Sequence, residues 1–315
     1  MLRFICLIIN KNIKQKTYIV SLNHSINLFC ATMKLTIKEV ILLSRPRFWM
    51  YVLGTFLVGL ISSGNLFLYD TSTTLLLVAF GVFFSVPVNV FIYGVNDIYD
   101  YQTDIHNAKK IKYESVLPLE KHRDLWKIMS CLLIPFLPLF FIVNISTKLA
   151  LLLFLFAGFF YSATPIRAKS KPPLDVLFSA IIYVSPALVG FFITGNTNIE
   201  WLAVFGGLVW AFGMQTYSAI PDIEADKKAG VNTLAIMLGK INALWFCLIT
   251  YVISAFIGFY YVGCISIVFG LVYTTMVLLS MNNISKLFKY YTYFPLINAI
   301  SGAVLFFYLF FKEIL

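Results

Sequence analysis

Long runs of apolar residues alternate with short polar segments along most of the chain. Each run holds roughly 17–25 residues, enough for a helix to cross a hydrocarbon core of about 30 Å. The runs are unbroken, without the alternating pattern of a membrane barrel, so they predict an all-α protein of about nine transmembrane helices. The predicted spans are Phe48–Leu68, Thr74–Val95, Leu125–Val143, Thr147–Ala163, Leu174–Thr194, Ile199–Ile220, Ile241–Tyr260, Val262–Ser280 and Tyr291–Phe311.

The composition supports the same prediction. Of 315 residues, 60% are hydrophobic and 12% are charged, whereas soluble domains average about 45–50% and about 25%. So few charges could not cover the surface of a water-soluble globule, and the same numbers exclude disordered and collagen-like chains. The five cysteines are scattered and form no CxxC pair, which argues against a disulfide framework or a zinc cluster.

The charge balance predicts the orientation in the membrane. The chain carries 24 Lys and Arg against 14 Asp and Glu, a net charge of +10. In a soluble protein this excess could indicate a nucleic-acid partner, but in a membrane protein basic residues collect in cytoplasmic loops. With the N-terminus in the cytoplasm, 22 of the 24 basic residues fall on that side. We therefore expect an integral, multi-pass protein, with the cell membrane as its expected location, a C-terminus outside and no nucleic-acid partner.

The first 32 residues differ from the rest of the chain. The apolar run Phe4–Ile9 is too short to span a bilayer and is not followed by a small-residue cleavage site, which argues against a signal peptide. Met33 is a plausible alternative start, because a short basic stretch and the first predicted span follow it. We expect residues 1–32 to be a dispensable or wrongly assigned leader, and residues 33–315 to form one transmembrane domain.

A first group of acidic residues follows the second predicted span and reads NDIYDYQTD from Asn96 to Asp104. If the helix continues through this stretch, Asp97, Asp100 and Asp104 share one face, because residues three and four apart are helical neighbours. Clustered carboxylates repel one another, and oxygen ligands of this kind suit a hard divalent cation. Mg²⁺ typically binds one or two carboxylates together with substrate phosphates.

A second group, DIEAD from Asp222 to Asp226, follows the sixth predicted span. Asp222 and Asp226 again lie four residues apart, while Glu224 points away because two residues turn a helix by about 200°. Two acidic groups at the same membrane depth predict a Mg²⁺ clamp for a diphosphate. The alternative from sequence alone is a pair of solvated acidic loops. An ion or proton transporter is a further alternative, although transporters hold such acids near the bilayer midplane.

Basic residues at the same membrane depth complete the predicted site. The loop after the fourth span runs from Tyr161 to Lys169 and includes Arg167. Arg offers a fork of donors suited to phosphate oxygens, and Lys offers a point charge. Arg45 and Arg47 precede the first span at the same level. For each of these basic residues alone, a topology signal is the better explanation. The adjacent Tyr161 and Pro165, which indicate a shaped turn, strengthen the case for Arg167 and Lys169.

At these residues the chain resembles the UbiA superfamily of intramembrane prenyltransferases, over about residues 40–311. That family has nine helices, an NDxxDxxxD loop after the second, a Tyr/Lys loop after the fourth and a DxxxD loop after the sixth. The chain departs from a strict YxxxK pattern at Pro165. Short stretches resemble the carotenoid branch of lycopene elongase/hydratase-like enzymes: SRPRFW from Ser44, YGVND from Tyr93, NAKK from Asn107 and IPDIEADKKAG from Ile220.

The resemblance implies a UbiA-type bundle whose active-site cavity lies on the cytoplasmic side. It implies transfer of an isoprenyl group from an allylic diphosphate to a hydrophobic acceptor in the bilayer, with lycopene or a related carotenoid as the expected acceptor. Two Mg²⁺ ions would bind to five catalytic acids, and substrate contacts would come from five further residues. The acids are Asp97, Asp100, Asp104, Asp222 and Asp226, and the substrate-binding residues are Asn96, Tyr161, Arg167, Lys169 and Arg47. An aromatic-acceptor prenyltransferase of quinone or chlorophyll biosynthesis would share these residues and remains the alternative.

Overall fold

The structure is a computed structural model that describes residues 35–64, 71–105 and 116–314. The predicted leader, residues 1–32, and the NAKK stretch lie outside the described residues. Helices make up the regular structure of the described segments, and these segments contain no strand. The prediction of an all-α fold is therefore confirmed.

Helices in the first half of the chain are shorter than the apolar runs predict. The first span opens with the 3₁₀-helix η1 (Pro46–Tyr51) and continues as α4 (Leu53–Ile61). The second divides into α5 (Thr71–Phe83) and α6 (Val86–Tyr99). The third divides into α9 (His122–Leu133), the short η3 (Ile134–Phe136) and α10 (Leu137–Ile142).

Proline causes both divisions, because it lacks a backbone N–H and restricts the residue before it. Pro87 lies in the first turn of α6, and Pro135 and Pro138 flank the break in the third span. The buried side chain of Asn89 donates a hydrogen bond of 2.6 Å to the carbonyl of Ser85 at the first break. The backbone N–H of Asn89 donates to the same carbonyl at 3.4 Å. The side-chain bond therefore supplements a long backbone bond at the break, where water is scarce in a membrane interior.

From Ile145 onward most helices are longer, and they follow the predicted spans to within a few residues. They are α11 (Ile145–Phe160), α12 (Leu174–Phe192), α13 (Trp201–Ala219), α15 (Leu234–Val262), α16 (Cys264–Asn282) and α17 (Leu287–Ile314). The seventh span starts earlier than predicted because α15 includes a kinked first segment, where Gly239 has φ 75° and ψ 163°. The predicted start at Ile241 corresponds to the end of that kink.

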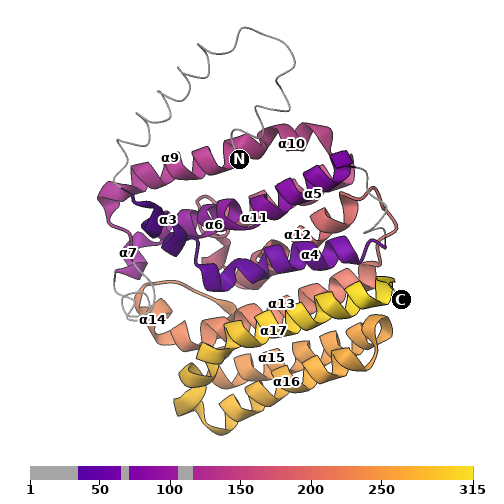
Figure 1. Ribbon diagram of the computed structural model, residues 1–315. Helices are drawn as coiled ribbons and strands as arrows, with labels where there is room; N and C mark the ends of the chain where they lie inside the picture. The colour runs from indigo at the N-terminus through magenta and orange to yellow at the C-terminus, as the bar shows by residue number, and fades with distance from the viewer. Residues whose placement is uncertain (1–34, 65–70, 106–115, 315) are drawn as a thin grey trace.

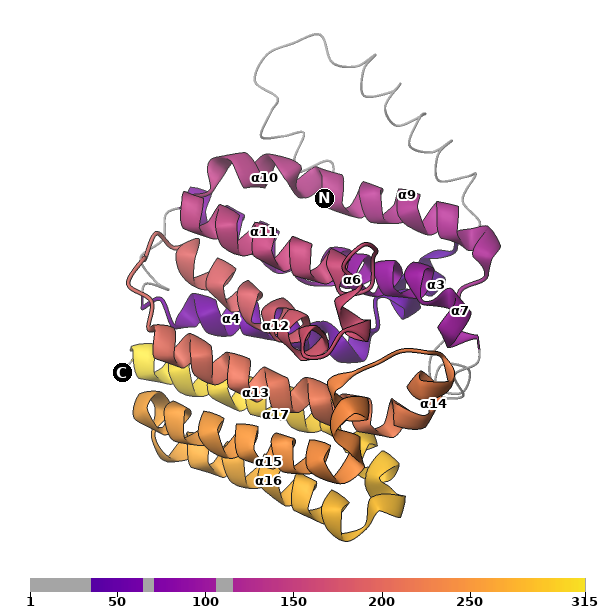
Figure 2. The same ribbon diagram turned by 180° about the vertical axis from the view of Figure 1, so that it is seen from behind.

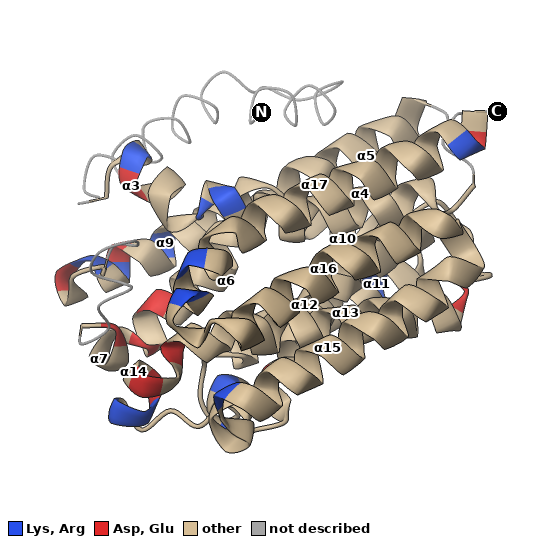
Figure 3. Cartoon of the chain, turned by 90° about the horizontal axis from the view of Figure 1, so that it is seen from below, with Lys and Arg blue, Asp and Glu red and all other residues tan. Residues whose placement is uncertain are grey.

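The helices lie side by side as a bundle with its connections at two ends (Figures 1 and 2). By length and apolar composition, six helical segments in the described residues could cross a membrane, and Pro46–Ile61 and Ile145–Phe160 are shorter apolar helices. The short helices α7 (Tyr101–Asp104) and α14 (Ile223–Lys228) lie together at one end, and the C-terminus lies at the other. Most of the charged residues lie at the end with α7 and α14 (Figure 3).

The helices α4 and α12 approach each other through small residues. A Cβ atom added to Gly59 would lie 1.9 Å from the carbonyl oxygen of Ala187, and one added to Gly190 would lie 2.2 Å from that of Phe56. Small residues allow such close approach, which is a main source of helix association in membranes. Because α4 follows directly after the segment that contains Arg45, this contact also positions the site described below.

The short helix α3 (Ile37–Leu43) packs at the charged end and is held by two interactions. Thr36 and Glu39 form a capping box at its start. Lys121, in the 3₁₀-helix η2 (Leu119–Lys121), donates a hydrogen bond of 2.5 Å to Glu39. The bond from Lys121 lowers the pKa of Glu39 to about 2, so the ion pair persists at neutral pH.

We predict that Gly190→Ala destabilises the protein, because the new methyl group would collide with the backbone of α4. The expected loss is about 1–3 kcal/mol, the usual cost of overpacking, measured as the shift of the unfolding transition in detergent. The matched control is Gly81→Ala on α5, where an added Cβ meets nothing within 4 Å. Equal stability of the two variants would contradict the close contact between α4 and α12.

Candidate active site

A polar cavity of about 250 Å³ opens at the charged end of the bundle. Its wall comes from segments far apart in the sequence: η1 with its flanking residues, the end of α6 with α7, the loop after α11, the middle of α12, the end of α13 with α14 and the connection that follows it, and α17. The polar side chains that line it include those of Arg45, Asn96, Asp104, Tyr161, Lys169, Gln215, Asp222 and Asp226. Both predicted acidic groups therefore contribute to one cavity.

The first acidic group continues the helix of the second span almost as predicted. The helix α6 ends at Tyr99, Asp100 forms its C-cap, and α7 resumes at once. The carbonyl of Asp100 accepts a backbone hydrogen bond of 2.9 Å from Asp104, so the helical turn is retained. Asp97, Asp100 and Asp104 are buried, with exposed fractions of 5%, 0% and 8%. Burying three acids here requires positive partners nearby.

The second acidic group lies where the sixth span ends. After α13, Pro221 occupies the 3₁₀-helix η5 (Ile220–Asp222), and α14 begins directly after Asp222. Asp222 and Asp226 line the cavity. Glu224 lies outside it, where Lys240 forms an exposed ion pair with it at 3.2 Å. The prediction that Glu224 points away from the other two acids is confirmed.

Three basic side chains pair with the first acidic group. The Arg45 guanidinium donates to Asp97 at 2.8 Å and lies over the ring of Tyr93, 4.5 Å from its centre. The Lys169 ammonium lies 2.5 Å from one oxygen of Asp100, and Arg167 lies 3.4 Å from the other. Asp97, Asp100 and Arg167 are not among the residues that line the cavity. The two acids are held directly behind the lining residues Arg45 and Lys169 by these ion pairs, which come from two other segments.

The loop after α11 that supplies these cations is compact. Backbone hydrogen bonds of 2.8 Å and 2.9 Å run from Arg167 to the carbonyl of Ala163 and from Lys169 to that of Tyr161. Arg167 has φ 46°, in the left-handed region. Pro165, where the family pattern has Lys, lies inside this turn, and both cations after it contact Asp100. The loop therefore places positive charge at the acids despite its departure from the family pattern.

Of the two arginines before the first span, Arg45 is the one that lines the cavity. Arg45 has φ 49°, and this turn directs its side chain to Asp97. The predicted residue, Arg47, lies instead over the ring of Phe48 at 4.7 Å and is not among the residues that line the cavity. The position of a single arginine on a short 3₁₀-helix depends on backbone angles that the sequence does not specify.

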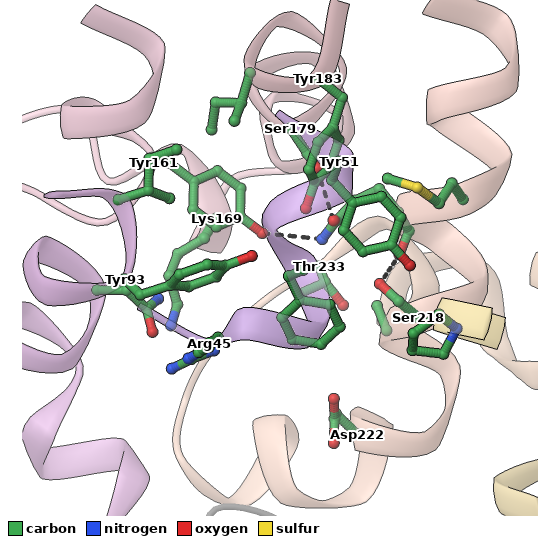
Figure 4. A pocket seen from close by; sticks show the side chains of 18 of the residues that line it. Arg45, Tyr51, Tyr93, Tyr161, Lys169, Ser179, Tyr183, Ser218, Asp222 and Thr233 are labelled. Atoms are coloured by element: carbon green, nitrogen blue, oxygen red, sulfur yellow. Dashed lines mark hydrogen bonds between the residues drawn. The ribbon is translucent and has the colours of Figure 1, made fainter. Parts of the chain in front are cut away.

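Asn96 and Tyr161 each belong to a hydrogen-bond network. The Asn96 amide donates to Asp100 at 2.6 Å and to the Ser162 hydroxyl at 3.0 Å. The Tyr161 hydroxyl accepts a bond of 2.9 Å from Gln215, whose carbonyl oxygen accepts one of 2.7 Å from Ser179 (Figure 4). Gln215 is not among the residues predicted from the sequence, although an amide inside an apolar span is a recognisable signal, since polar groups in a membrane are costly.

Charged side chains lie on two sides of the cavity. In Figure 4, Arg45 and Lys169 lie on one side of it and Asp222 on the other. In the described part of the chain, no three Asp, Glu, His or Cys side chains are grouped closely enough to hold a metal ion by themselves. Mg²⁺ does not require three, because substrate phosphates usually complete its shell. The donor set, carboxylates on two facing segments with cations beside them, suits a divalent ion that binds together with a diphosphate.

Comparison with known proteins gives a consistent result. The model of the UbiA prenyltransferase family matches residues 49–294. A lycopene elongase/hydratase of Haloarcula japonica is 33% identical over 274 residues, covering 83% of this chain and 87% of the relative. One of Halobacterium salinarum is 33% identical over 273 residues, covering 85% and 95%. A UbiA homolog from Archaeoglobus fulgidus, solved bound to GPP and Mg²⁺, has a TM-score of 0.65 at 21% identity, covering 88% and 99% of the two chains.

We predict that Asp100→Asn lowers the free energy of unfolding by about 2 kcal/mol in the absence of substrate, because it removes the negative partner of Lys169 and Arg167. Denaturant titration of the purified protein in detergent measures the loss. The control is Glu224→Gln, which breaks an acid–lysine pair in the neighbouring loop that is exposed to solvent. Exposed pairs contribute little, so this variant should unfold at the wild-type midpoint. A smaller effect of Asp100→Asn than of Glu224→Gln would contradict the structural role of the buried pair.

Proposed function

The chain belongs to the UbiA prenyltransferase family, and we propose that it transfers an isoprenyl group from an allylic diphosphate to the end of a linear carotenoid such as lycopene. The observation that carries the proposal is the polar cavity, where acids from two halves of the chain face each other beside Arg45 and Lys169. The carotenoid acceptor is supported by relatives named lycopene elongase/hydratase that are 33% identical over most of the chain.

Two Mg²⁺ ions would be held by the acids of the two facing segments. Asp97, Asp100 and Asp104 would bind from one side, and Asp222 and Asp226 from the other. Asn96 would supply a neutral oxygen or orient Asp100, to which its amide already donates. When bound, the metal neutralises charge that builds up on the departing diphosphate.

The basic residues have two roles in this proposal. Before substrate binds, Arg45, Arg167 and Lys169 balance the charge of Asp97 and Asp100. When the diphosphate is present, Arg167 and Lys169 stabilise the negative charge on its oxygens, which is electrostatic stabilisation of the transition state. Tyr161, fixed by Gln215, orients the substrate at the cavity wall.

The chemistry begins with cleavage of the allylic carbon–oxygen bond, whose electron pair leaves with the diphosphate. The resulting allylic cation accepts the π electrons of the acceptor's terminal double bond, and a new carbon–carbon bond forms. The cation produced on the acceptor then loses a proton or takes up water and releases a proton. Aromatic rings of Phe48, Tyr51, Tyr93 and Tyr183 in the cavity wall offer π faces to a cation and limit access of water.

The same proposal includes the placement of the protein in its membrane. We propose nine crossings, with the charged end of the bundle at the cytoplasmic face, the N-terminus on the same side and the C-terminus outside. The positive-inside bias and the gathering of charged residues around α7 and α14 support this orientation. Residues 33–315 form the single catalytic domain, and residues 1–32 are dispensable.

The clamp is tested by Asp97→Asn and Asp222→Asn, one substitution in each acidic group. Each should lower prenyl transfer roughly 100-fold or more, because a neutral amide cannot hold the metal and diphosphate charge. Membranes containing the protein are incubated with labelled allylic diphosphate, Mg²⁺ and lycopene, and labelled product is extracted. Glu224→Gln is the control and should transfer at the wild-type rate. Near-normal transfer by either aspartate variant would refute the clamp.

The acceptor is tested by expressing the chain in cells that make lycopene. The pigment extract should contain carotenoids heavier than lycopene by whole isoprenyl units, with or without added water, and mass spectrometry measures the shift. Cells expressing Asp97→Asn provide the background. Unchanged pigment together with prenylated aromatic acceptors in the same membranes would instead support the aromatic-acceptor alternative.

A further inference from the structure

A second, larger cavity of about 680 Å³ lies between α4, α12, α13, α15, α16 and α17. Its wall is mainly apolar and includes Val58, Leu188, Phe191, Val204 and Ile257. Its volume is in the range that encloses a whole small-molecule ligand. Such a cavity inside a membrane bundle favours the binding of a long apolar ligand.

The two cavities share part of their walls. Tyr51 and Tyr183 line both of them, and their ring centres are 5.4 Å apart. The Tyr51 hydroxyl accepts a hydrogen bond of 2.7 Å from the amide of Asn298, whose oxygen accepts one of 2.7 Å from Tyr273. These polar groups satisfy one another, and the two tyrosine rings mark where the polar cavity meets the apolar one.

The second cavity runs away from the diphosphate site toward the opposite end of the bundle. Along α17 its wall extends from Asn298 to Glu313, which is about 22 Å at 1.5 Å per residue. The hydrocarbon core of a bilayer is about 30 Å thick. The cavity therefore follows the bundle axis through most of the membrane, rather than branching sideways near the site.

The far end of the cavity is polar. Asn196 and Asn198 from the α12–α13 connection, Glu200 before α13, and Lys312 and Glu313 near the C-terminus contribute to its wall there. This rim lies at the end of the bundle opposite α7 and α14 (Figure 1). An apolar channel with a polar rim fits a rod-shaped guest whose distant end can carry a hydroxyl group.

We infer that this second cavity holds the acceptor, a linear polyene that lies along the bundle axis. One terminal double bond lies at the Tyr51–Tyr183 junction. A C40 polyene is longer than the roughly 22 Å of cavity wall along α17. Its chain therefore passes the rim at Asn196, Glu200 and Lys312, and its other end lies beyond that rim. The inference rests on the proposed function, and it identifies the place and orientation of the acceptor. It also implies that a polyene already hydroxylated at one end remains a substrate, because that end lies past the polar rim while the unmodified end reacts.

The test uses Gly302→Trp on α17. Gly302 lines the second cavity, and a Cβ atom added there meets nothing within 4 Å, so an indole can enter the cavity without displacing a helix. Transfer of a dimethylallyl group to lycopene should fall at least tenfold. Thermal stabilisation by dimethylallyl diphosphate with Mg²⁺ should remain, because the polar cavity is untouched.

Two further variants keep the result interpretable. Gly81→Trp on α5 is the matched control, since its added Cβ also meets nothing within 4 Å and it lines neither cavity. It should transfer at the wild-type rate. Gly207→Leu on α13 narrows the second cavity from another side, and its Cβ makes only an ordinary contact of 3.6 Å with Val184. It replaces Gly302→Trp if that variant unfolds, and should reduce transfer in the same way.

The outcomes separate the two proposals. If the wild type transfers no prenyl group to any polyene, the proposed acceptor is wrong. If the wild type does so and both folded cavity variants match it, the inference about the second cavity is overturned. It is also overturned if these variants keep transfer to lycopene from dimethylallyl diphosphate but lose it from a geranylgeranyl donor. That result would assign the cavity to the donor's tail.

Discussion

The pairing of acids and bases at one end of the bundle is the interaction on which the rest of the structure depends. Asp97 and Asp100 are nearly or fully inaccessible to solvent, and a buried carboxylate without a partner would be strongly destabilising. Arg45, Arg167 and Lys169 supply the partners from the segment before α4 and the loop after α11. Two separate segments of the chain are thereby held around the end of α6.

Backbone strain at two of these residues shows how strictly the pairing constrains the chain. Arg45 and Arg167 are the only non-glycine residues with positive φ in the described segments. A left-handed conformation costs a side-chain-bearing residue on the order of 1 kcal/mol. Both residues point their guanidinium groups at an acid, so the ion pairs offset the strain. Strain of this kind is typical of functional sites, because a well-packed surrounding structure is needed to maintain it.

Much of this arrangement could be predicted from the sequence, and the exceptions have physical causes. The lengths of the apolar runs predicted the bounds of the helices from α11 onward to within a few residues, apart from the early start of α15. The length of the apolar runs did not predict the breaks at Pro87 and Pro135, because a single proline changes the overall hydrophobicity of a long apolar run very little.

The spacing of the acidic residues predicted which segments meet at the site. It could not decide between Arg45 and Arg47, since that choice depends on a left-handed turn. The large cavity was beyond prediction because six helices form it together. The roles in catalysis remain predictions.

The division between a polar and an apolar cavity follows from the chemistry that a bilayer permits. Charged groups deep in the hydrocarbon are costly, so a diphosphate and its metal ions are best bound at a helix end, where Asp104, Asp222 and Asp226 lie. A transporter would need its acids near the midplane, and these acids are not there. A polyene has the opposite preference and gains by staying in apolar surroundings. The two reactants can meet only where the environments join, and Tyr51 and Tyr183 line both cavities at that boundary.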